Sequence, residues 1–325
     1  MTALLDVREL SVEFRTRRGP VRALDRVSFS IAAGEVLGVV GESGAGKSLT
    51  GAAIIGLLEP PGRISGGEVL LDGKRIDDLP NAKMRPIRGK QIGAIFQDPL
   101  TTLNPLYTIG RQLAETIMTH LKVGATEARK RAIFWLERVG IPAAAQRIDA
   151  YPHEFSGGMR QRVVIALALC AEPRLIVADE PTTALDVSIQ AQIIDLLKAL
   201  TRERSTSVML ITHDMGVIAE TADRVAVMYA GRLVEIGRVA DIVHRPSHPY
   251  TRGLMDSIPA LDRRVERLRQ LDGSMPRLHA LPPGCAYHPR CGQVFDRCRI
   301  ERPDLMPARN TEAACWLYDP ASAHV

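Results

Sequence analysis

The sequence has 325 residues, a length that is typical of about two domains. Apolar residues make up 46% and charged residues 24%, an average globular composition that argues against disordered, collagen-like and low-complexity classes. The formal net charge is +5. A basic surface suits phosphates, anionic lipid or nucleic acid, but this value is also ordinary for a globular protein and does not choose among them.

Neither the hydropathy nor the N-terminus indicates insertion into a membrane or secretion. The longest uncharged stretches, residues 48–58 and 99–110, are far shorter than the roughly 18 apolar residues that a spanning helix needs. The N-terminus carries acidic residues where a signal peptide has its apolar run. We therefore expect neither a membrane span nor secretion, and a reducing compartment for the cysteines.

Short β-rich runs alternate with helical periods along much of the chain. An apolar strand at 36–40 precedes a helix that should extend to about residue 58, and a strand at 175–178 precedes a helix from about 188. This alternation predicts an α/β core with a parallel sheet. Near the N-terminus, the extended segments 7–14 and 68–71, with the turn pair Asp72-Gly73, predict antiparallel strands beside the core.

Two regions depart from the α/β pattern. Strand signals vanish between residues 99 and 171, where helices are predicted at 109–121, 126–139 and 157–170. After about residue 245, frequent prolines exclude long helices. We therefore predict a nucleotide-binding domain at 1–245, with a helical subdomain at about 98–172, and a C-terminal extension at 246–325.

A phosphate-binding loop is the strongest motif. The segment 41–48 matches G-x-x-x-x-G-K-[ST] and lies between a predicted strand and a predicted helix, the context that this motif requires. Its glycines let backbone N–H groups surround the ATP phosphates, Lys47 reaches the β and γ oxygens, and the Ser48 hydroxyl suits Mg²⁺. The predicted ATP-binding residues of this segment are Gly41, Glu42, Ser43, Gly44, Ala45, Gly46, Lys47, Ser48 and the following Leu49.

Two further strand ends carry polar side chains. The apolar run 175–178 leads into Asp179 and Glu180, which predicts a magnesium-holding carboxylate and a general base for the attacking water. His213 follows the predicted strand 208–212 and could donate a hydrogen bond to transition-state charge. A solvated strand end and a capping histidine are the alternative interpretations, and the phosphate loop favours the catalytic ones.

The segment FSGGMRQR at 155–162, together with the motifs above, FQD at 96–98 and TALD at 183–186, resembles an ATP-binding cassette (ABC) ATPase over residues 1–245. The resemblance implies the ABC fold: a P-loop parallel sheet with an antiparallel β subdomain and a helical insertion. Ser156 can cap a helix whose N-terminus, with Gly157 and Gly158, forms a second anion seat. In this family two cassettes pair head to tail, each supplying this seat to ATP held by the other. The commonest form of the motif is LSGGQ, so Phe155 and Met159 are departures that leave Ser-Gly-Gly intact.

The resemblance also assigns roles to single residues. Gln97 takes the place of the sensor of Mg²⁺ and water, and Asp186 that of the organiser of the dimer seam. Phe14 takes the place of the aromatic that stacks on adenine, with a core or edge-strand Phe as the alternative. The implied catalytic set is Glu180, His213 and Lys47, and the implied Mg²⁺ ligands are Ser48, Gln97 and Asp179.

Three segments resemble the ATPases of dipeptide and oligopeptide importers more closely: 96–105, 151–162 and SHPYTR at 247–252. The resemblance implies three kinds of partner: a second, related ATPase subunit, two permease subunits that dock around residues 100–111, and an extracytoplasmic solute-binding protein. The implied location is the cytoplasmic face of the bacterial inner membrane. The alternative is a soluble ABC-type ATPase acting on nucleic acid or ribosomes; we expect no nucleic-acid partner.

Four cysteines cluster near the C-terminus, at Cys285, Cys291, Cys298 and Cys315. Their spacing, C-x5-C-x6-C-x16-C, is unlike a C-x2-C zinc ribbon, but four thiols in a proline-rich segment indicate a metal. The resemblance to peptide-importer ATPases implies a [4Fe-4S] cluster. Zinc and unligated buried thiols remain alternatives, whereas disulfides do not suit a reducing compartment.

Overall fold

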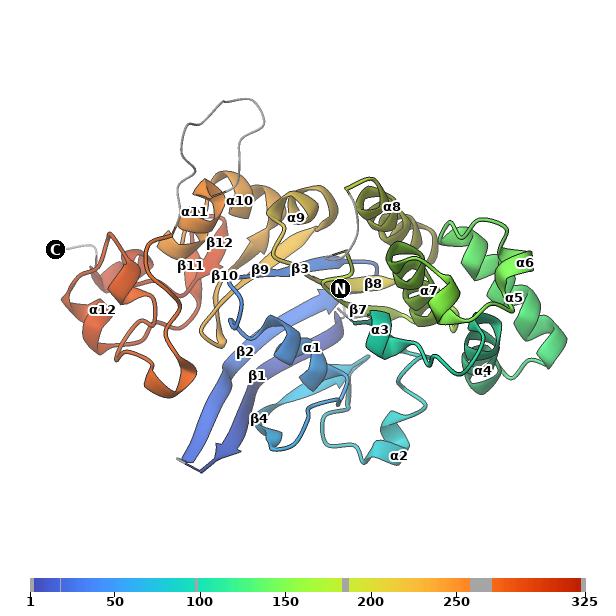
Figure 1. Ribbon diagram of the computed structural model, residues 1–325. Coiled ribbons are helices and arrows are strands. Elements are labelled where there is room, and N and C mark those ends of the chain that lie inside the picture. Colours follow the sequence, from blue (N-terminus) through green and yellow to red (C-terminus); the bar gives the residue numbers. More distant parts are fainter. Residues whose placement is uncertain (1–2, 18, 97–98, 183–186, 258–270, 323–325) are drawn as a thin grey trace. The chain divides into compact units, whose positions relative to one another are not determined.

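The computed structural model describes residues 3–17, 19–96, 99–182, 187–257 and 271–322 (Figure 1). It divides into two compact units that are interleaved along the chain. The first is built mainly from residues 78–210, with short segments near residues 3–4 and 32–35. The second contains residues 5–31, 36–77 and the chain from residue 211 onwards.

The strands of the first unit are short, apolar and buried. β6 (Ile92–Ile95) pairs in parallel with β7 (Leu175–Asp179), which lies between β6 and β8 (Ser207–Ile211). In β7 and β8 almost every side chain is buried, as expected of parallel strands covered on both faces. The parallel pairing confirms the predicted strand at 175–178.

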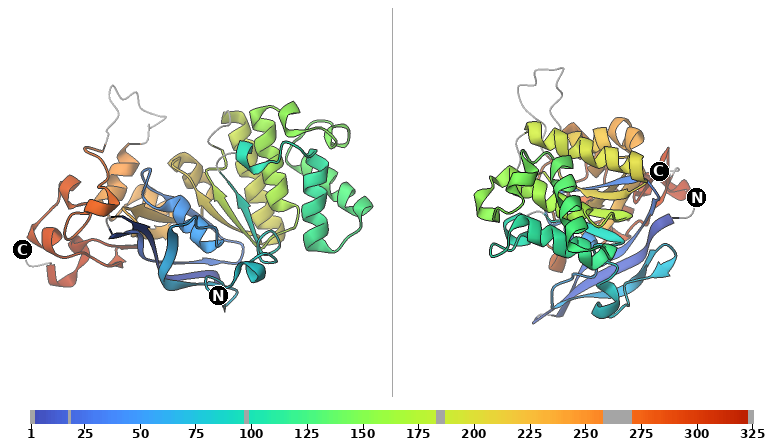
Figure 2. Two further views of the ribbon diagram at one scale, coloured as in Figure 1. Left: turned by 60° about the horizontal axis from the view of Figure 1, so that its bottom comes forward. Right: turned by 90° about the vertical axis from the view of Figure 1, so that its right-hand side faces the viewer.

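Helices make up the rest of the first unit, and residues 99–171 contain no strand, as predicted. α4, α5 and α7 pack against one another, and the views of Figure 2 show them as the adjacent green helices. α4 occupies the predicted range and starts at Thr108, whose hydroxyl accepts a hydrogen bond from the Arg111 N–H. The described helices of this unit are α2 (Asn81–Met84), α3 (Pro99–Thr102), α4 (Ile109–Leu121), α5 (Ala125–Arg138), α6 (Ala144–Arg147), η1 (Pro152–Glu154), α7 (Gly157–Leu169) and α8 (Val187–Arg204).

The second unit contains the predicted antiparallel sheet. Its order is β2 (Gly19–Ala32), β1 (Ala3–Thr16), β4 (Gly62–Leu71) and β5 (Lys74–Arg75). β1 runs antiparallel to β4. Asp72 and Gly73 both have positive φ, 53° and 74°, which is the conformation of a tight hairpin turn.

A second sheet of this unit joins the cassette to the C-terminal extension. Its order is β11 (Met306–Ala308), β12 (Thr311–Ala313), β10 (Arg232–Arg238), β9 (Arg224–Tyr229) and β3 (Val36–Val40). β3 pairs in parallel with β9, whereas β10 and β12 add antiparallel strands. Figure 1 shows β11 and β12 beside β10. The extension therefore adds strands to the sheet that contains the strand before the phosphate loop.

The helices in the described part of the second unit are short. They are α1 (Lys47–Ile54), α9 (Met215–Thr221), α10 (Val239–His244), α11 (Pro249–Asp256), α12 (Asp296–Ile300) and the 3₁₀ turns η2 (Leu278–Ala280), η3 (His288–Arg290), η4 (Trp316–Tyr318) and η5 (Pro320–Ser322). The helix expected to reach about residue 58 ends at Ile54. Gly56 has a φ of 67°, and the N–H groups of Gly56 and Leu57 donate to the carbonyls of Ala53 and Ala52. This glycine-based C-cap stops the helix earlier than its apolar composition suggested.

Candidate functional site

The phosphate loop connects β3 to α1, and its glycines are required by its backbone. Gly41, Gly44 and Gly46 have φ values of 149°, 80° and 105°. A Cβ at Gly41 would collide with the backbone carbonyl of Met228, and a Cβ at Gly46 would lie 2.7 Å from a methyl of Leu24. Gly46 is the N-cap of α1 and has no capping side chain. The loop therefore brings bare backbone to a helix N-terminus, the arrangement that binds phosphate groups.

Lys47 lies across the loop that precedes it. Its Nζ donates hydrogen bonds to the carbonyls of Gly41 at 2.7 Å and Glu42 at 3.1 Å, and the residue is 6% exposed. The neighbouring Ser48 is exposed. A buried ammonium and an exposed hydroxyl at the start of one helix can serve two different ligands, a phosphate oxygen and a hydrated cation.

His213 lies in the turn between residue 212 and α9, and its position follows from anchors on both sides. The Thr212 N–H donates to the carbonyl of Val39 in β3 at 3.3 Å. The Asp214 carboxylate caps α9 by accepting from the N–H groups of Gly216 and Val217. The exposed His213 is therefore attached to the end of the strand from which the phosphate loop leaves.

Phe14, the predicted adenine contact, is a half-buried residue of β1. It lies opposite Gly62 of β4, where an added Cβ would be 2.8 Å from Cε1 of its ring. The ring thus packs over a glycine of the antiparallel sheet. Its role in stacking on adenine remains a prediction.

The predicted carboxylates belong to the first unit, at the end of β7. Asp179 and Glu180 are both half-buried, and Glu180 has a φ of 46°, a left-handed conformation that is uncommon for a residue with a side chain. The next residue is fixed from α7, because the buried Gln161 amide donates to the carbonyl of Pro181 at 2.7 Å. Sequence reasoning did not select Gln161, although it lies within the FSGGMRQR segment.

The Ser-Gly-Gly segment forms an exposed helix start in the same unit. Ser156 is the N-cap of α7, and its hydroxyl accepts from the Met159 N–H at 3.4 Å. Ser156 and Gly157 are exposed, and space around the Gly157 Cα is open. The first turn of α7 carries no acidic side chain. A 13-residue helix whose exposed N-terminus carries no acidic side chain can receive an anion from another molecule.

The unusual residue of this segment is part of the core, since Phe155 is 3% exposed. Its replacement of the common leucine is an apolar exchange at a buried position. Two further predicted residues, Gln97 and Asp186, lie outside the described part of the chain.

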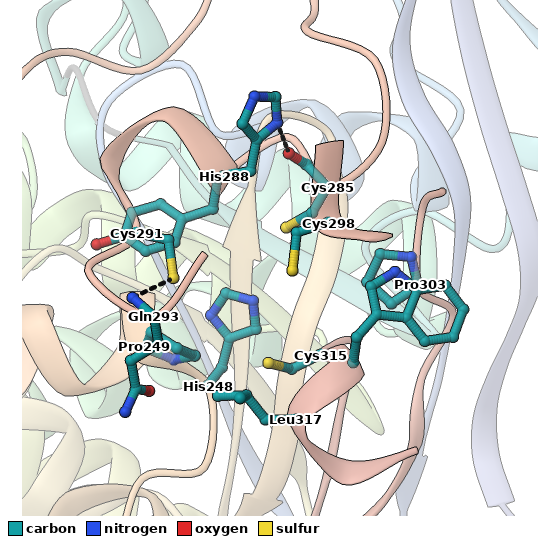
Figure 3. Close-up of a pocket in the computed structure, with 12 residues that line it drawn as sticks. His248, Pro249, Cys285, His288, Cys291, Gln293, Cys298, Pro303, Cys315 and Leu317 are labelled. Carbon is teal, nitrogen blue, oxygen red and sulfur yellow. Dashed lines mark hydrogen bonds between the residues drawn. The ribbon is translucent and has the colours of Figure 1, made fainter. Parts of the chain in front are cut away.

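All four C-terminal cysteines line one pocket. The pocket is small and partly open to solvent, and Figure 3 shows the sulfurs arranged around it. The segments that carry them are tied together, because the Cys285 N–H donates to the carbonyl of Cys298 at 2.9 Å. Burial raises the pKa of the Cys315 thiol to about 12. A bound cation would reverse this preference for the protonated thiol.

Two histidines, His248 and His288, also line this pocket. The ring of His248 is already engaged in hydrogen bonds. His248 is fully buried, its Nδ1 accepts from the Tyr250 N–H at 3.0 Å, and its ring also bonds the backbone of Ala314. Burial lowers the pKa of His248 to about 3, so the ring is neutral. Within the described residues, no three His, Cys, Asp or Glu side chains meet around one ion position. The four sulfurs therefore surround a small space, and they do not converge on the position of a single metal ion.

A buried carboxylate fastens the extension to the sheet. Glu235 of β10 is 0% exposed and accepts from the backbone N–H groups of Ser247 and His248 at 2.7 and 2.9 Å. It also accepts from the Thr311 hydroxyl of β12 at 2.9 Å. Sequence reasoning missed this residue, because a charged side chain in a strand gives no sign of being buried.

Comparisons of the sequence with known proteins show the family of this chain. The family model described as "ABC transporter" matches residues 24–183, and the one described as "Oligopeptide/dipeptide transporter, C-terminal region" matches residues 234–298. The dipeptide transport ATP-binding protein DppD of Bacillus subtilis is 47% identical, with 100% of this chain and 97% of the relative covered. DppD of Escherichia coli is 46% identical, with 96% of each chain covered. The chain belongs to the ATP-binding subunits of ABC transporters of the dipeptide and oligopeptide family.

Solved structures of ABC proteins share the cassette fold. The dimeric ATP-binding cassette MJ0796 bound to ADP and Pi has a TM-score of 0.67 and 29% identity, covering 72% of this chain and 98% of that one. CbiO1 of Clostridium perfringens has a TM-score of 0.63 and 30% identity, covering 75% and 92%. These likenesses confirm the predicted ABC fold. The relatives do not favour the alternative of an ATPase acting on nucleic acid or ribosomes.

This ABC ATPase has, among its described residues, no helix with the length and apolar character of a membrane span. The structure brings two groups of predicted residues together: the phosphate loop with His213 in the second unit, and the four cysteines in one pocket. In the first unit it presents the carboxylates at the end of β7 and the Ser-Gly-Gly segment at the start of α7.

Proposed function

We propose that the chain is the ATP-hydrolysing motor subunit of a bacterial importer for dipeptides or oligopeptides. The observation that carries the proposal is the full-length similarity to dipeptide and oligopeptide transport ATP-binding proteins, which extends through the C-terminal region. The phosphate loop, with its bare glycine backbone and its buried lysine, supports ATP binding. ATP binding and hydrolysis then drive conformational change in a partner.

Each nucleotide site is proposed to use residues of two subunits. The phosphate loop and Lys47 hold the phosphates, Phe14 stacks on adenine, and Ser156, Gly157 and Gly158 of the second subunit complete the site. The exposed start of α7, which has no acidic side chain, supports a role in trans, because a surface helix N-terminus can receive a phosphate held by another chain. Asp186 contributes to the seam between the subunits.

The hydrolytic roles follow from chemistry at the end of β7. Glu180 orients and polarises the attacking water, and His213 donates a hydrogen bond to charge that develops on the γ-phosphate. Mg²⁺ would be held by Ser48, Gln97 and Asp179, and it supplies charge neutralisation of the phosphates when bound.

The proposed partners are a related second ATPase subunit, two permease subunits and an extracytoplasmic solute-binding protein. The proposed location of this chain is the cytoplasmic face of the inner membrane.

The permease is proposed to dock on residues 100–111. Leu106 in this segment is 79% exposed, an apolar side chain available for a partner helix. Arg111 stacks on Tyr107 at 3.9 Å from the ring centroid, which orders the neighbouring surface.

The decisive test is Glu180→Gln in the complex of ATPases and permease reconstituted in vesicles with the binding protein. We expect ATP still to bind while multiple-turnover hydrolysis and peptide uptake are lost, because an amide cannot accept the proton of the attacking water. Glu172→Gln, at an exposed position in the same unit, is the matched control and should hydrolyse ATP normally. Sustained turnover by Glu180→Gln, or full-rate hydrolysis by a demonstrably monomeric chain, would contradict the proposal.

We also propose that the cysteine pocket holds a [4Fe-4S] cluster through Cys285, Cys291, Cys298 and Cys315. Four thiols around one volume fit the donor set of such a cluster, and the ring of His248 is already hydrogen-bonded to Tyr250 and Ala314. A bound cluster would crosslink the extension. Anaerobically purified protein should contain iron and sulfide and absorb near about 400 nm, as iron–thiolate charge transfer does. Colourless protein with one zinc per chain would refute the cluster.

A further inference from the structure

Glu42, the second residue of the phosphate loop, is held by two residues of the C-terminal extension. Its carboxylate accepts one hydrogen bond from each terminal nitrogen of Arg290, both at 2.9 Å. Its backbone N–H donates to the phenolic oxygen of Tyr250 at 2.9 Å. The loop is therefore fixed through the side chain and the backbone of one residue, by partners 248 and 208 positions further along the chain.

The Arg290 guanidinium is committed to this contact. Its side chain is 8% exposed, whereas that of Glu42 is 25% exposed. Besides the bidentate pair, Nε donates to the carbonyl of Asp272 at 2.7 Å, and Nη1 also approaches the Tyr229 hydroxyl at 3.3 Å. Because these bonds use most of the five donors of the planar fork, its orientation is fixed, and a fixed arginine restrains the carboxylate that it holds.

A cluster of three tyrosines supports the same contact. The ring centroids of Tyr229 and Tyr250 are 4.6 Å apart, and Tyr287 lies within 5.3 and 5.4 Å of the other two. Arg290 lies within 6 Å of the rings of Tyr229 and Tyr287. Tyr229 is the last residue of β9, which pairs with the strand before the phosphate loop. Packed aromatic rings therefore support the Arg290 side of the ion pair.

The other end of this assembly is the cysteine pocket. Arg290 immediately precedes Cys291, and both Cys291 and Tyr287 line the pocket. The Cys291 N–H donates to the carbonyl of His288, which closes a tight turn around Arg290. A change of state in the pocket that moves Cys291 must therefore move the residue that holds Glu42.

We propose that Arg290 is a positioning residue for ATP, which holds the phosphate loop in its nucleotide-binding conformation and couples it to the cysteine pocket. This inference rests on the proposed function, in which residues 41–48 hold the phosphates. If the Arg290–Glu42 ion pair increases the affinity for ATP by some factor, bound ATP must stabilise that ion pair by the same factor, because coupling free energies are reciprocal. A change in the C-terminal extension therefore alters the affinity for ATP, and ATP binding in turn alters the extension.

The first test measures nucleotide affinity. Arg290→Met in the full-length protein should raise the Kd for Mg-AMP-PNP and the KM for ATP about tenfold, with kcat changed less than twofold, and Arg290→Lys should restore part of the affinity. Arg302→Met is the matched control, because Arg302 joins the extension to Asp25 of β2 at 3.0 Å without contacting the loop. We expect this control to keep the wild-type Kd.

The second test measures the reverse direction in cluster-free protein prepared with a chelator: the rate at which iodoacetamide alkylates the free thiol of Cys291. Mg-AMP-PNP should slow alkylation severalfold in the wild type and not in Arg290→Met. If Arg290→Met does not fold, Glu42→Gln breaks the same pair from the loop side. An unchanged Kd in both variants, or an equal loss in Arg302→Met, would overturn the inference. Undiminished nucleotide binding by Lys47→Ala would instead overturn the proposed function, so the two failures are distinguishable.

Discussion

Glu235 offers the sharpest test of how the extension is held. The carboxylate is fully buried in β10, and its oxygens accept from the N–H groups of Ser247 and His248 and from the hydroxyl of Thr311. Glu235→Leu removes the acceptor for all three donors at nearly constant volume. The Thr311 hydroxyl keeps a second acceptor, the carbonyl of Ala308 at 3.0 Å, so two buried backbone N–H groups lose their partner.

Each buried N–H left without an acceptor costs about 1–3 kcal/mol, so the free energy of unfolding should fall by about 4 kcal/mol. For a unit of this size, that lowers Tm by roughly 8–16 °C. Glu235→Gln should lie between the wild type and Glu235→Leu. Its carbonyl can replace Oε1, which serves Ser247 and Thr311, but its amide then faces the His248 N–H, donor against donor.

Scanning calorimetry and amide hydrogen exchange at Ser247 and His248 measure the effect. Glu312→Gln is the matched control, since Glu312 is an exposed residue of the neighbouring β12 and should change stability by no more than about 0.5 kcal/mol. A Glu235→Leu variant with the wild-type Tm and undiminished protection of both amides would refute the assignment of Glu235 as the anchor.

Three further variants test the nucleotide site. Gly46→Ala should lose most ATP affinity in equilibrium binding, because the residue has a φ of 105° and its Cβ would lie 2.7 Å from Leu24. Lys47→Ala should weaken ATP binding by roughly 10- to 100-fold, the value of a charge-assisted hydrogen bond of about 1.5–3 kcal/mol, as isothermal titration would show. Ser156→Ala should lower the stability of α7 by about 1 kcal/mol in chemical denaturation and should reduce ATPase activity of the paired subunits.

Local patterns made much of the cassette predictable. The periodicity of α4 and the apolar run of β7 lie within segments whose structure depends on near neighbours, and both matched their predicted ranges closely. The phosphate loop was equally accessible, since its glycine spacing is dictated by its own backbone. The helix after the loop was predicted too long. Its apolar sequence continues to residue 58, but the C-cap at Gly56 ends the helix at Ile54.

The sequence alone thus determined the chemistry of the protein: a phosphate-binding loop, a pair of carboxylates after a buried strand, a Ser-Gly-Gly helix start and four clustered thiols. Only the tertiary structure decided that the thiols line one pocket, that Glu235 is buried, and that Arg290 holds Glu42. The reason is physical. These contacts join residues far apart in the chain, and their burial and pairing arise when separate strands meet in one sheet. The spacing of residues along the sequence therefore cannot predict them.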